Sequence, residues 1–274
     1  MNKIKNNFEI RFLLKMEIDW KDEILYKDLV MWGPRLKREA PFFQEILQNI
    51  QKKDIRILDV SCGTGDHLVM FAKWGFSGIG IDISEQNIEQ ARIVAQRNNC
   101  TDKVDFILGD ILDLENNIAN EKFDFIFCIG NTLSIFNATE RRNIINQMIN
   151  LLSDKGVILI QVVNYLSHKD EEHWFYNPSL KRGPNGALLF HVRMMEWKNK
   201  YDKITMYVQK IYQSDYESEE FDLHKKRTEF FVISEKDFRE FTSGEINLNI
   251  FGDYQKNNFK EKESNDLVVI LQKD

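Results

Sequence analysis

The chain has 274 residues, of which 43% are hydrophobic and 29% are charged, and its formal net charge is −6. These proportions are typical of a globular domain, and 13 glycines with 4 prolines exclude a collagen-like or Pro/Gly-rich disordered chain. An acidic chain is a poor partner for a phosphate backbone, to which Lys and Arg supply most of the affinity. We therefore expect no nucleic-acid partner.

The cysteines and the apolar runs indicate the compartment. Cys62, Cys100 and Cys128 form no close pair and have no zinc-ligand spacing, which argues against a disulfide framework and a metal site. No apolar run approaches the ~18 residues of a membrane helix. Residues 1–7 are polar and lack the apolar core of a signal peptide. We expect a soluble cytoplasmic protein, monomeric or homodimeric, with no membrane partner.

The first half of the chain alternates between two hydrophobic periods. Residues 8–50 have a helical pattern, in which Pro41 suits the first turn of the clearest helix. Apolar runs at 55–60, 79–82, 104–108, 123–129 and 157–163 then predict short strands separated by helices, one of them capped by Ser84. This alternation predicts an α/β fold with a mostly parallel sheet and helices on both faces.

The pattern changes after Tyr165. Residues 166–186 are polar and contain turn signals, whereas 187–233 alternate with a period of two, which predicts an inserted antiparallel sheet of about three strands. Ser234 and Asp237 form a capping pattern for a last helix through Phe241, and 246–251 with 267–271 are typical of a closing strand pair. We predict an N-terminal helical cap (1–39), a main domain (40–165 and 234–274) and an antiparallel β lid (166–233).

Glycine and acidic or amide residues follow successive strands, at the edge where ligands bind in open α/β sheets. Gly63 and Gly65 let a ligand approach the backbone, and the helix that follows directs N–H groups toward it. Asp82 can accept hydrogen bonds from both hydroxyls of a ribose, and Asp110 can accept one from an adenine amino group. Asn131 follows the next strand. Together these residues predict a nucleotide-type site.

The third glycine of the dinucleotide fingerprint is missing, because Leu68 occupies its position. This argues against a nicotinamide-dependent oxidoreductase, which stays open as an alternative. S-adenosylmethionine (SAM) contains no phosphate and does not need that glycine.

The sequence motifs resemble those of class I SAM-dependent methyltransferases. Residues 57–65 (ILDVSCGTG) resemble the first motif, and 80–84, 109–111 and 123–124 resemble the next ones in order. The resemblance implies a Rossmann-like seven-stranded sheet whose last two strands form a hairpin. It also implies transfer of a methyl group to a small-molecule acceptor by in-line displacement.

A narrower resemblance is to the glycine and sarcosine N-methyltransferases. It rests on Trp32-Gly-Pro-Arg35 with Arg38-Glu39, on residues 128–133 (CIGNTL) and on Asn164-Tyr165. In that group an N-terminal segment closes over the cofactor, and the Asn of the Gly-Asn motif lies beside the transfer centre. The two resemblances together imply cofactor contacts from Tyr26, Trp32, Arg35, Arg38, Asp59, Ser61, Cys62, Gly63, Gly65, Asp82, Ile83, Asp110, Ile111, Cys128, Gly130 and Asn131.

Asn131 and Tyr165 are the expected catalytic residues, and Asn131, Asn164, Tyr165 and Arg193 are expected to contact the acceptor. The N-methyltransferase group carries an Arg just before its Asn-Tyr pair to hold an amino-acid carboxylate. Val163 occupies that position here, so free glycine is disfavoured and Arg193 is the substitute anchor.

An amine is the favoured acceptor, while an O-methyltransferase and a non-catalytic cofactor-binding protein stay open as alternatives. A neutral amine needs no general base, whereas a hydroxyl acceptor does, for which Tyr165, His168 and His191 are candidates. His168 and His173 flank three acidic residues, but their spacing differs from a helical zinc pair, so a solvated loop is the better interpretation.

Overall fold

The computed structural model describes residues 32–118, 121–182, 188–198, 202–213, 222–241 and 246–273. A seven-stranded sheet has the order β10-β11-β5-β4-β1-β2-β3. Neighbouring strands from β3 to β5 are parallel, and β11 is antiparallel to both of its neighbours. The bounds are β1 Arg56–Val60, β2 Ser77–Asp82, β3 Val104–Leu108, β4 Phe123–Cys128, β5 Leu152–Val163, β10 Ile246–Phe251 and β11 Asp266–Lys273.

Helices cover both faces of this sheet, as predicted. Adjacent residues of one strand enter different cores: Ile57 packs with Phe43 and Phe71 from α3 and α4, whereas Leu58 packs with Ile144 from α7. Burial on both faces explains why β4 is apolar along nearly its whole length. The helices are α3 Trp32–Asn49, α4 Asp66–Lys73, α5 Glu85–Arg97, α6 Leu114–Asn117, α7 Ala138–Leu151 and α8 Glu235–Phe241, with 3₁₀ turns η1 Ile111–Asp113, η2 Thr132–Ile135 and η3 Tyr165–His168.

Helix α3 corrects one prediction. It already includes Trp32, and Pro41 lies inside it rather than in its first turn. A proline inside a helix removes one hydrogen bond to the carbonyl four residues earlier. That residue is Lys37, which is exposed, so water can satisfy the carbonyl. The described helix therefore joins the predicted cap and main domain across residue 40.

A separate four-stranded sheet follows β5, in the sequential order β6 (His173–Arg182), β7 (Leu188–Lys198), β8 (Lys203–Gln213) and β9 (Asp222–Phe231). The sequence predicted about three strands and missed β6, which contains Pro178. Proline is tolerated on an edge strand or at a bulge. Strand β6 is an edge strand, and its register with β7 shifts between Tyr176 and Ser179.

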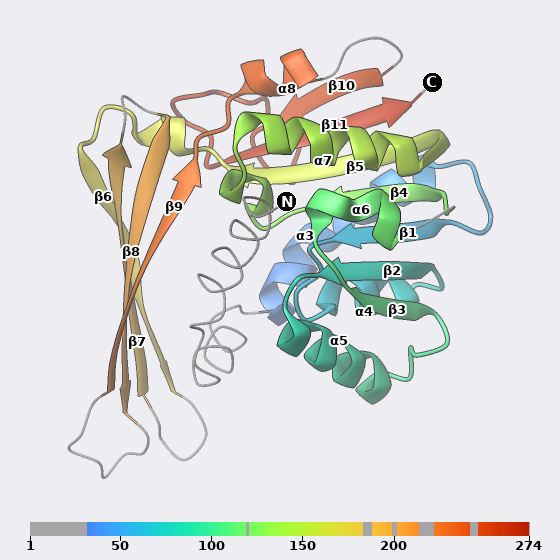
Figure 1. The fold of residues 1–274 in the computed structure, drawn as a ribbon, viewed down its shortest axis with the longest axis horizontal. Helices are drawn as coiled ribbons and strands as arrows, with labels where there is room; N and C mark the ends of the chain where they lie inside the picture. Colours follow the sequence, from blue (N-terminus) through green and yellow to red (C-terminus); the bar gives the residue numbers. More distant parts are fainter. Residues whose placement is uncertain are drawn as a thin grey trace, which may run out of the picture.

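The second sheet stands beyond the edge of the first sheet to which the carboxyl ends of β1, β2 and β4 point (Figure 1). Its base packs on the end of β5 through a buried cluster of Tyr165, Trp174, Met195 and Ile204. Arg193 lies two residues from Met195 on β7 and therefore shares this inner face.

The C-terminal elements agree with the sequence predictions. The backbone N–H and hydroxyl of Ser234 donate to Asp237 at the start of α8, and β10 pairs antiparallel with β11. Among the described residues, no helix is long and apolar enough to cross a membrane.

Candidate functional site

The loop Ser61–Gly65 joins β1 to α4, and hydrogen bonds to the neighbouring strand β2 hold its backbone in place. The N–H groups of Ser61 and Cys62 donate to the Ile81 carbonyl at 2.8 and 2.9 Å. The N–H of Gly63 donates to Oδ2 of Asp82 at 2.9 Å. The side chain of Asp82 thus fixes the loop that opens α4.

The two glycines of this loop are required for different physical reasons. Both have positive φ, 54° at Gly63 and 74° at Gly65. A Cβ on Gly65 would lie 2.7 Å from the Phe106 ring and 2.9 Å from Ala91, so Gly65 permits close packing between α4, α5 and β3. A Cβ on Gly63 would meet no atom of the described residues within 4 Å. The open space at Gly63 is where a ligand can approach the backbone.

Asp82 ends β2 and is 5% exposed. Its other oxygen accepts from the backbone of Ser84 at 3.0 Å and from Nδ2 of Asn87 at 3.2 Å. Ile83 follows it and is half-buried. Strand, cap and helix therefore hold this carboxylate in one orientation at the sheet edge.

Asp110 lies just beyond β3, where its Oδ1 accepts from the N–H of Leu112 at 3.0 Å and caps η1. It is half-buried. The next side chain, Ile111, packs in the core with Leu58 and Ile144. Its burial is accounted for by that packing without a ligand.

Asp59 is the buried carboxylate of β1, and its Oδ2 has no hydrogen-bond partner among the described residues. Burial raises its pKa well above the usual range, and the nearby Asp82 adds to the effect, while Arg35 opposes it. A buried oxygen without a partner is costly. Asp59 is therefore suited to meet a polar or cationic ligand group.

Cys62 and Cys128 pack in the interior beside Asp59. Both thiols are buried, and burial followed by the charge of Asp59 raises the pKa of each. Neither is a reactive thiolate. Any contact from Cys62 to a ligand would come from its backbone, because its side chain lies in the core with Leu68.

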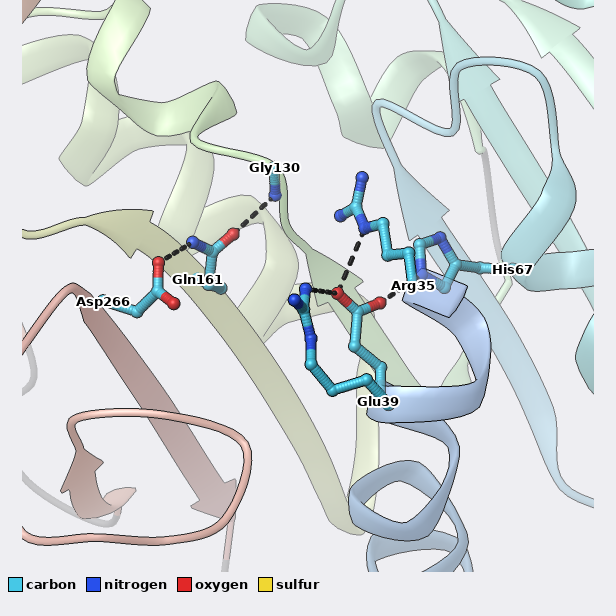
Figure 2. Close-up of polar contacts among 7 residues, drawn as sticks. Arg35, Glu39, His67, Gly130, Gln161 and Asp266 are labelled. Atoms are coloured by element: carbon cyan, nitrogen blue, oxygen red, sulfur yellow. Dashed lines mark hydrogen bonds and ion pairs between the residues drawn. The ribbon is translucent and has the colours of Figure 1, made fainter. Parts of the chain in front are cut away.

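Strand β4 ends in a Gly-Asn turn. Gly130 has a φ of 79°, and its N–H donates to Oε1 of Gln161 at 2.8 Å, while Nε2 of Gln161 donates to Asp266 at 2.7 Å (Figure 2). Asn131 has a φ of 69°. The turn is thus fastened to β5 and β11.

The side chain of Asn131 is held by three groups. Its Oδ1 accepts from the Ser134 hydroxyl at 2.8 Å and from the backbone of Val163 at 2.9 Å. Its Nδ2 donates to the phenol oxygen of Tyr165 at 2.8 Å. Burial raises the pKa of Tyr165 above its usual range, although Asn131 and Arg193 oppose the rise. The phenol is protonated at neutral pH, which argues against Tyr165 as a general base.

Asn164 and Arg193 have different surroundings. The Nδ2 of Asn164 donates to the carbonyls of Glu261 and Ser264 at 2.8 and 2.7 Å, so both amide hydrogens are used to hold the segment before β11. These contacts explain its burial without a substrate. The guanidinium of Arg193 lies 4.8 Å from the ring centroid of Tyr176 on the inner face.

A buried ionic cluster lies where α3 meets α4. The sequence pattern indicated no role for two of its members, Glu39 and His67. Glu39 lies between Arg35 and His67 (Figure 2). Arg38 also approaches Glu39, at 3.5 Å. The rings of Trp32 and His67 are nearly perpendicular, with centroids 5.4 Å apart, and the indole N–H of Trp32 has no partner among the described residues.

The structure gathers most of the predicted cofactor residues at the carboxyl ends of β1, β2, β3 and β4. The loop 61–65, Asp59, Asp82, Asp110 and Gly130 all lie at these ends. Tyr26 lies outside the described residues. The cofactor and acceptor roles of all these residues stay predictions.

The described residues contain no group of three or more His, Cys, Asp or Glu arranged for a metal ion. His168 instead contacts Glu171 at 2.7 Å and stacks on Trp174 with a centroid distance of 4.6 Å.

Comparison with known proteins decides the family. The sequence profile of the methyltransferase domain matches residues 51–204, which is more than half of the chain. The chain belongs to the methyltransferase domain family. Glycine/sarcosine N-methyltransferase from Halorhodospira halochloris is 29% identical over 160 residues, 55% of this chain and 56% of that protein. The chain therefore spans about half the length of the curated relatives it matches.

Solved structures support the same fold. A SAM-dependent methyltransferase from Clostridium acetobutylicum superimposes with a TM-score of 0.69 at 17% identity, covering 98% of each chain. A SAM-bound amino pentose methyltransferase from Micromonospora echinaspora gives 0.68 at 15% identity, covering 93% of this chain and 98% of that one. The chain thus contains a SAM-dependent methyltransferase domain of the Rossmann-like class I fold.

The residues present fit this cofactor. Oδ2 of Asp59, which has no partner among the described residues, can face the ammonium group of the SAM amino-acid portion, and the space at Gly63 leaves room beside the loop. Asp82 and Asp110 lie at the ends of β2 and β3, where the predicted acceptors for a ribose and an adenine amino group, respectively, are required.

Proposed function

We propose that this protein methylates an amine nitrogen of a small molecule. The main observation behind this proposal is the Asn131–Tyr165 pair, which joins the ends of β4 and β5 with a hydrogen bond of 2.8 Å. SAM, when bound, supplies a methyl group already activated by a sulfonium. Positioning of the acceptor and exclusion of water can then provide much of the rate.

The protonation state of Tyr165 supports an amine rather than a hydroxyl acceptor. A hydroxyl must lose its proton to become a good nucleophile, whereas a neutral amine brings its own lone pair. Tyr165 accepts from Asn131, so its own hydroxyl hydrogen points elsewhere and can donate to an acceptor atom. The buried protonated phenol is suited to orient an acceptor and poorly suited to remove a proton.

Arg193 supports an acceptor that carries an anionic group. Its side chain shares the inner face with Tyr176, its charge acts on Tyr165, and Val163 leaves the end of β5 without a cation. No carboxylate pairs with Arg193 among the described residues. A partly buried guanidinium is a strong binding group for a carboxylate or phosphate.

The predicted domain layout enters this proposal. We infer that the sheet β6–β9, within the predicted segment 166–233, covers the acceptor, because its base packs on Tyr165. The named relatives are a glycine/sarcosine N-methyltransferase and an amino pentose methyltransferase, both of which fit a small amine acceptor.

The first experiment is calorimetric titration of the purified protein with SAM, S-adenosylhomocysteine and NAD. Micromolar binding of the first two and no binding of NAD is the expected result. Binding of NAD alone would overturn the proposal, and binding of SAM with no methyl transfer to any acceptor would indicate a non-catalytic protein.

The acceptor class is tested with matched amines that differ in one anionic group, such as 2-aminoethanol against 2-aminoethyl phosphate and benzylamine against 4-(aminomethyl)benzoate. Formation of S-adenosylhomocysteine is measured for the parent and for Arg193→Gln. We expect faster turnover of the anionic member, and we expect Arg193→Gln to abolish the difference. Turnover of hydroxyl compounds instead would favour an O-methyltransferase.

A further inference from the structure

Three side chains from two helices converge on the carboxylate of Glu39. Its Oε1 accepts from Nε of Arg35 at 3.1 Å, one helical turn away on α3. Its Oε2 lies 2.8 Å from Nε2 of His67, the second residue of α4. The third side chain is that of Arg38, whose Nη2 lies 3.5 Å from the same Oε1. Oε1 therefore faces two arginines and Oε2 faces the histidine, so the carboxylate links α3 to the helix that follows the glycine loop.

Because the cluster is buried, the charge of Glu39 requires bound partners. Glu39 is 1% exposed and His67 is 4% exposed. A buried carboxylate must be paired, since removal of one partner leaves an uncompensated charge. An exposed ion pair at the same helical spacing would contribute little. The burial therefore distinguishes Glu39 from an ordinary surface pair.

The charge states follow from the surroundings. Burial alone would raise the pKa of Glu39, but the hydrogen bond with His67 and the charge of Arg35 hold it below the usual range. Burial lowers the pKa of His67, against the opposing effect of Glu39. The histidine is neutral at pH 7, and its Nε2 carries the proton, because a carboxylate can only accept.

The cluster directs Arg35 toward the cofactor edge of the sheet. With Nε bound to Glu39, one Nη atom of Arg35 lies on the side of Gly130 (Figure 2), and a Cβ built on Gly130 would lie 3.8 Å from Nη2. The guanidinium also lies 5.1 Å from the ring centroid of Trp32. Its charge acts on Asp59 at the end of β1. Arg35 therefore lies between the ends of β1 and β4.

We propose that Glu39 and His67 are positioning residues, which hold the Arg35 guanidinium where it can bind the carboxylate of the amino-acid portion of SAM. This inference rests on the proposed function, because it assigns the cofactor to this edge of the sheet. Glu39 sets the direction of the guanidinium through its contact with Nε. His67 ties that direction to α4 and hence to the loop that faces the same ligand.

The test compares two ligands that share the adenosine and the sulfur. S-adenosylhomocysteine has the amino-acid portion, and 5′-methylthioadenosine lacks it. Calorimetry on Glu39→Gln is expected to show a Kd for S-adenosylhomocysteine at least about tenfold higher, which is the loss typical of a charge-assisted hydrogen bond. The Kd for methylthioadenosine should stay within about threefold, because the adenosine contacts are elsewhere.

Matched variants separate positioning from structural damage. His67→Gln keeps an N–H donor near the position of Nε2 and should retain affinity for S-adenosylhomocysteine, whereas His67→Phe removes the donor and should show the selective loss. Arg35→Lys should show the same selective loss as Glu39→Gln. Glu45→Gln changes an exposed glutamate of α3 that pairs with Lys256 and should change neither affinity.

The outcomes are distinct. Equal losses for both ligands would assign Glu39 a purely structural role and overturn the inference, as would unchanged affinity for both. If Glu39→Gln does not fold, the affinities of His67→Phe and His67→Gln for the same two ligands are compared instead, and a selective loss in His67→Phe alone supports the inference. If the parent protein binds neither ligand, the proposed function fails, and this result is separate from any failure of the variants.

Discussion

The amide nitrogen of Asn131 lies 2.8 Å from the phenol oxygen of Tyr165, which follows it by 34 residues in the sequence. The contact exists because β4 and β5 are parallel neighbours whose carboxyl ends lie side by side. Asn131 lies in the turn after β4 with a left-handed backbone conformation, and Tyr165 begins the 3₁₀ turn after β5. This pair forms the centre of the proposed acceptor site.

Removing either member should reduce turnover more than cofactor binding. Asn131→Gly keeps the positive φ of 69° accessible while deleting the amide, and Tyr165→Phe deletes only the hydroxyl. We expect kcat to fall by about 10²-fold in each, a typical effect of losing one catalytic hydrogen-bonding group. The Kd for S-adenosylhomocysteine should stay within about threefold. Unchanged kcat in both variants would show that the transfer centre lies elsewhere.

The two glycines of the loop should separate stability from binding. Gly65→Ala places a Cβ 2.7 Å from Phe106 and should lower the free energy of unfolding by about 2–4 kcal/mol, through overpacking and the positive φ. In Gly63→Ala the new Cβ lies within 4 Å of no described residue, so the substitution should cost about 1 kcal/mol of stability. It should nevertheless weaken binding of S-adenosylhomocysteine at least about tenfold. Denaturant unfolding and calorimetry measure the two effects. The reverse pattern would show that Gly63 does not face the ligand.

Asp82→Ala should remove cofactor binding, because this carboxylate fixes the Gly63 N–H and is the expected ribose acceptor. The loss of charge-assisted hydrogen bonds predicts a Kd for S-adenosylhomocysteine higher by about 10²-fold. Asp105→Ala, which changes an exposed residue of the neighbouring strand, is the control. Retained tight binding in Asp82→Ala, measured by calorimetry, would refute the ribose assignment.

Asp59→Asn should make the ligand-free protein more stable at high pH. Burial raises the pKa of Asp59 in the folded state above 3.8, which is its usual value. At a pH between these two pKa values, the folded state therefore binds more protons than the unfolded state. Stability from this group is therefore lost as pH rises, and the neutral Asn avoids that loss. We expect a Tm increase of at least about 2 °C at pH 8, equivalent to about 1 kcal/mol, and a smaller increase at pH 5.

Asp59→Asn should also weaken binding of S-adenosylhomocysteine, because the unpartnered Oδ2 is expected to face its ammonium group. The exposed Asp105→Asn should change neither property. A stability difference that shrinks as pH rises would contradict the assigned origin of the effect.

Local sequence signals predicted most of the main domain. The strands, the loop glycines and the cap at Ser84 follow from hydrophobic period and backbone chemistry, which act within a few residues. Strand β6 was missed because Pro178 is a breaker in most strands, and its tolerance here depends on the edge position of β6. An edge is a property of the sheet and is invisible in the strand itself.

Side-chain partners were less predictable. The pattern Arg35–Glu39 is that of an exposed helical ion pair, and only the packing of α3 against α4 buries it beside His67. Asn164 was expected at the acceptor, but its amide is used by carbonyls of residues about 100 positions later. Tertiary contacts of this kind leave no periodic trace in the sequence.

The sequence by itself determined the α/β class, the glycine loop and the edge of the sheet that carries the site, because short-range periodicity and backbone conformation encode them. The tertiary structure decided which side chains meet at that edge. It placed Tyr165 on Asn131 and His67 on Glu39, and it left Oδ2 of Asp59 without a protein partner among the described residues. These relationships depend on distances between elements that are far apart in the chain, and such distances are set only when the layers pack.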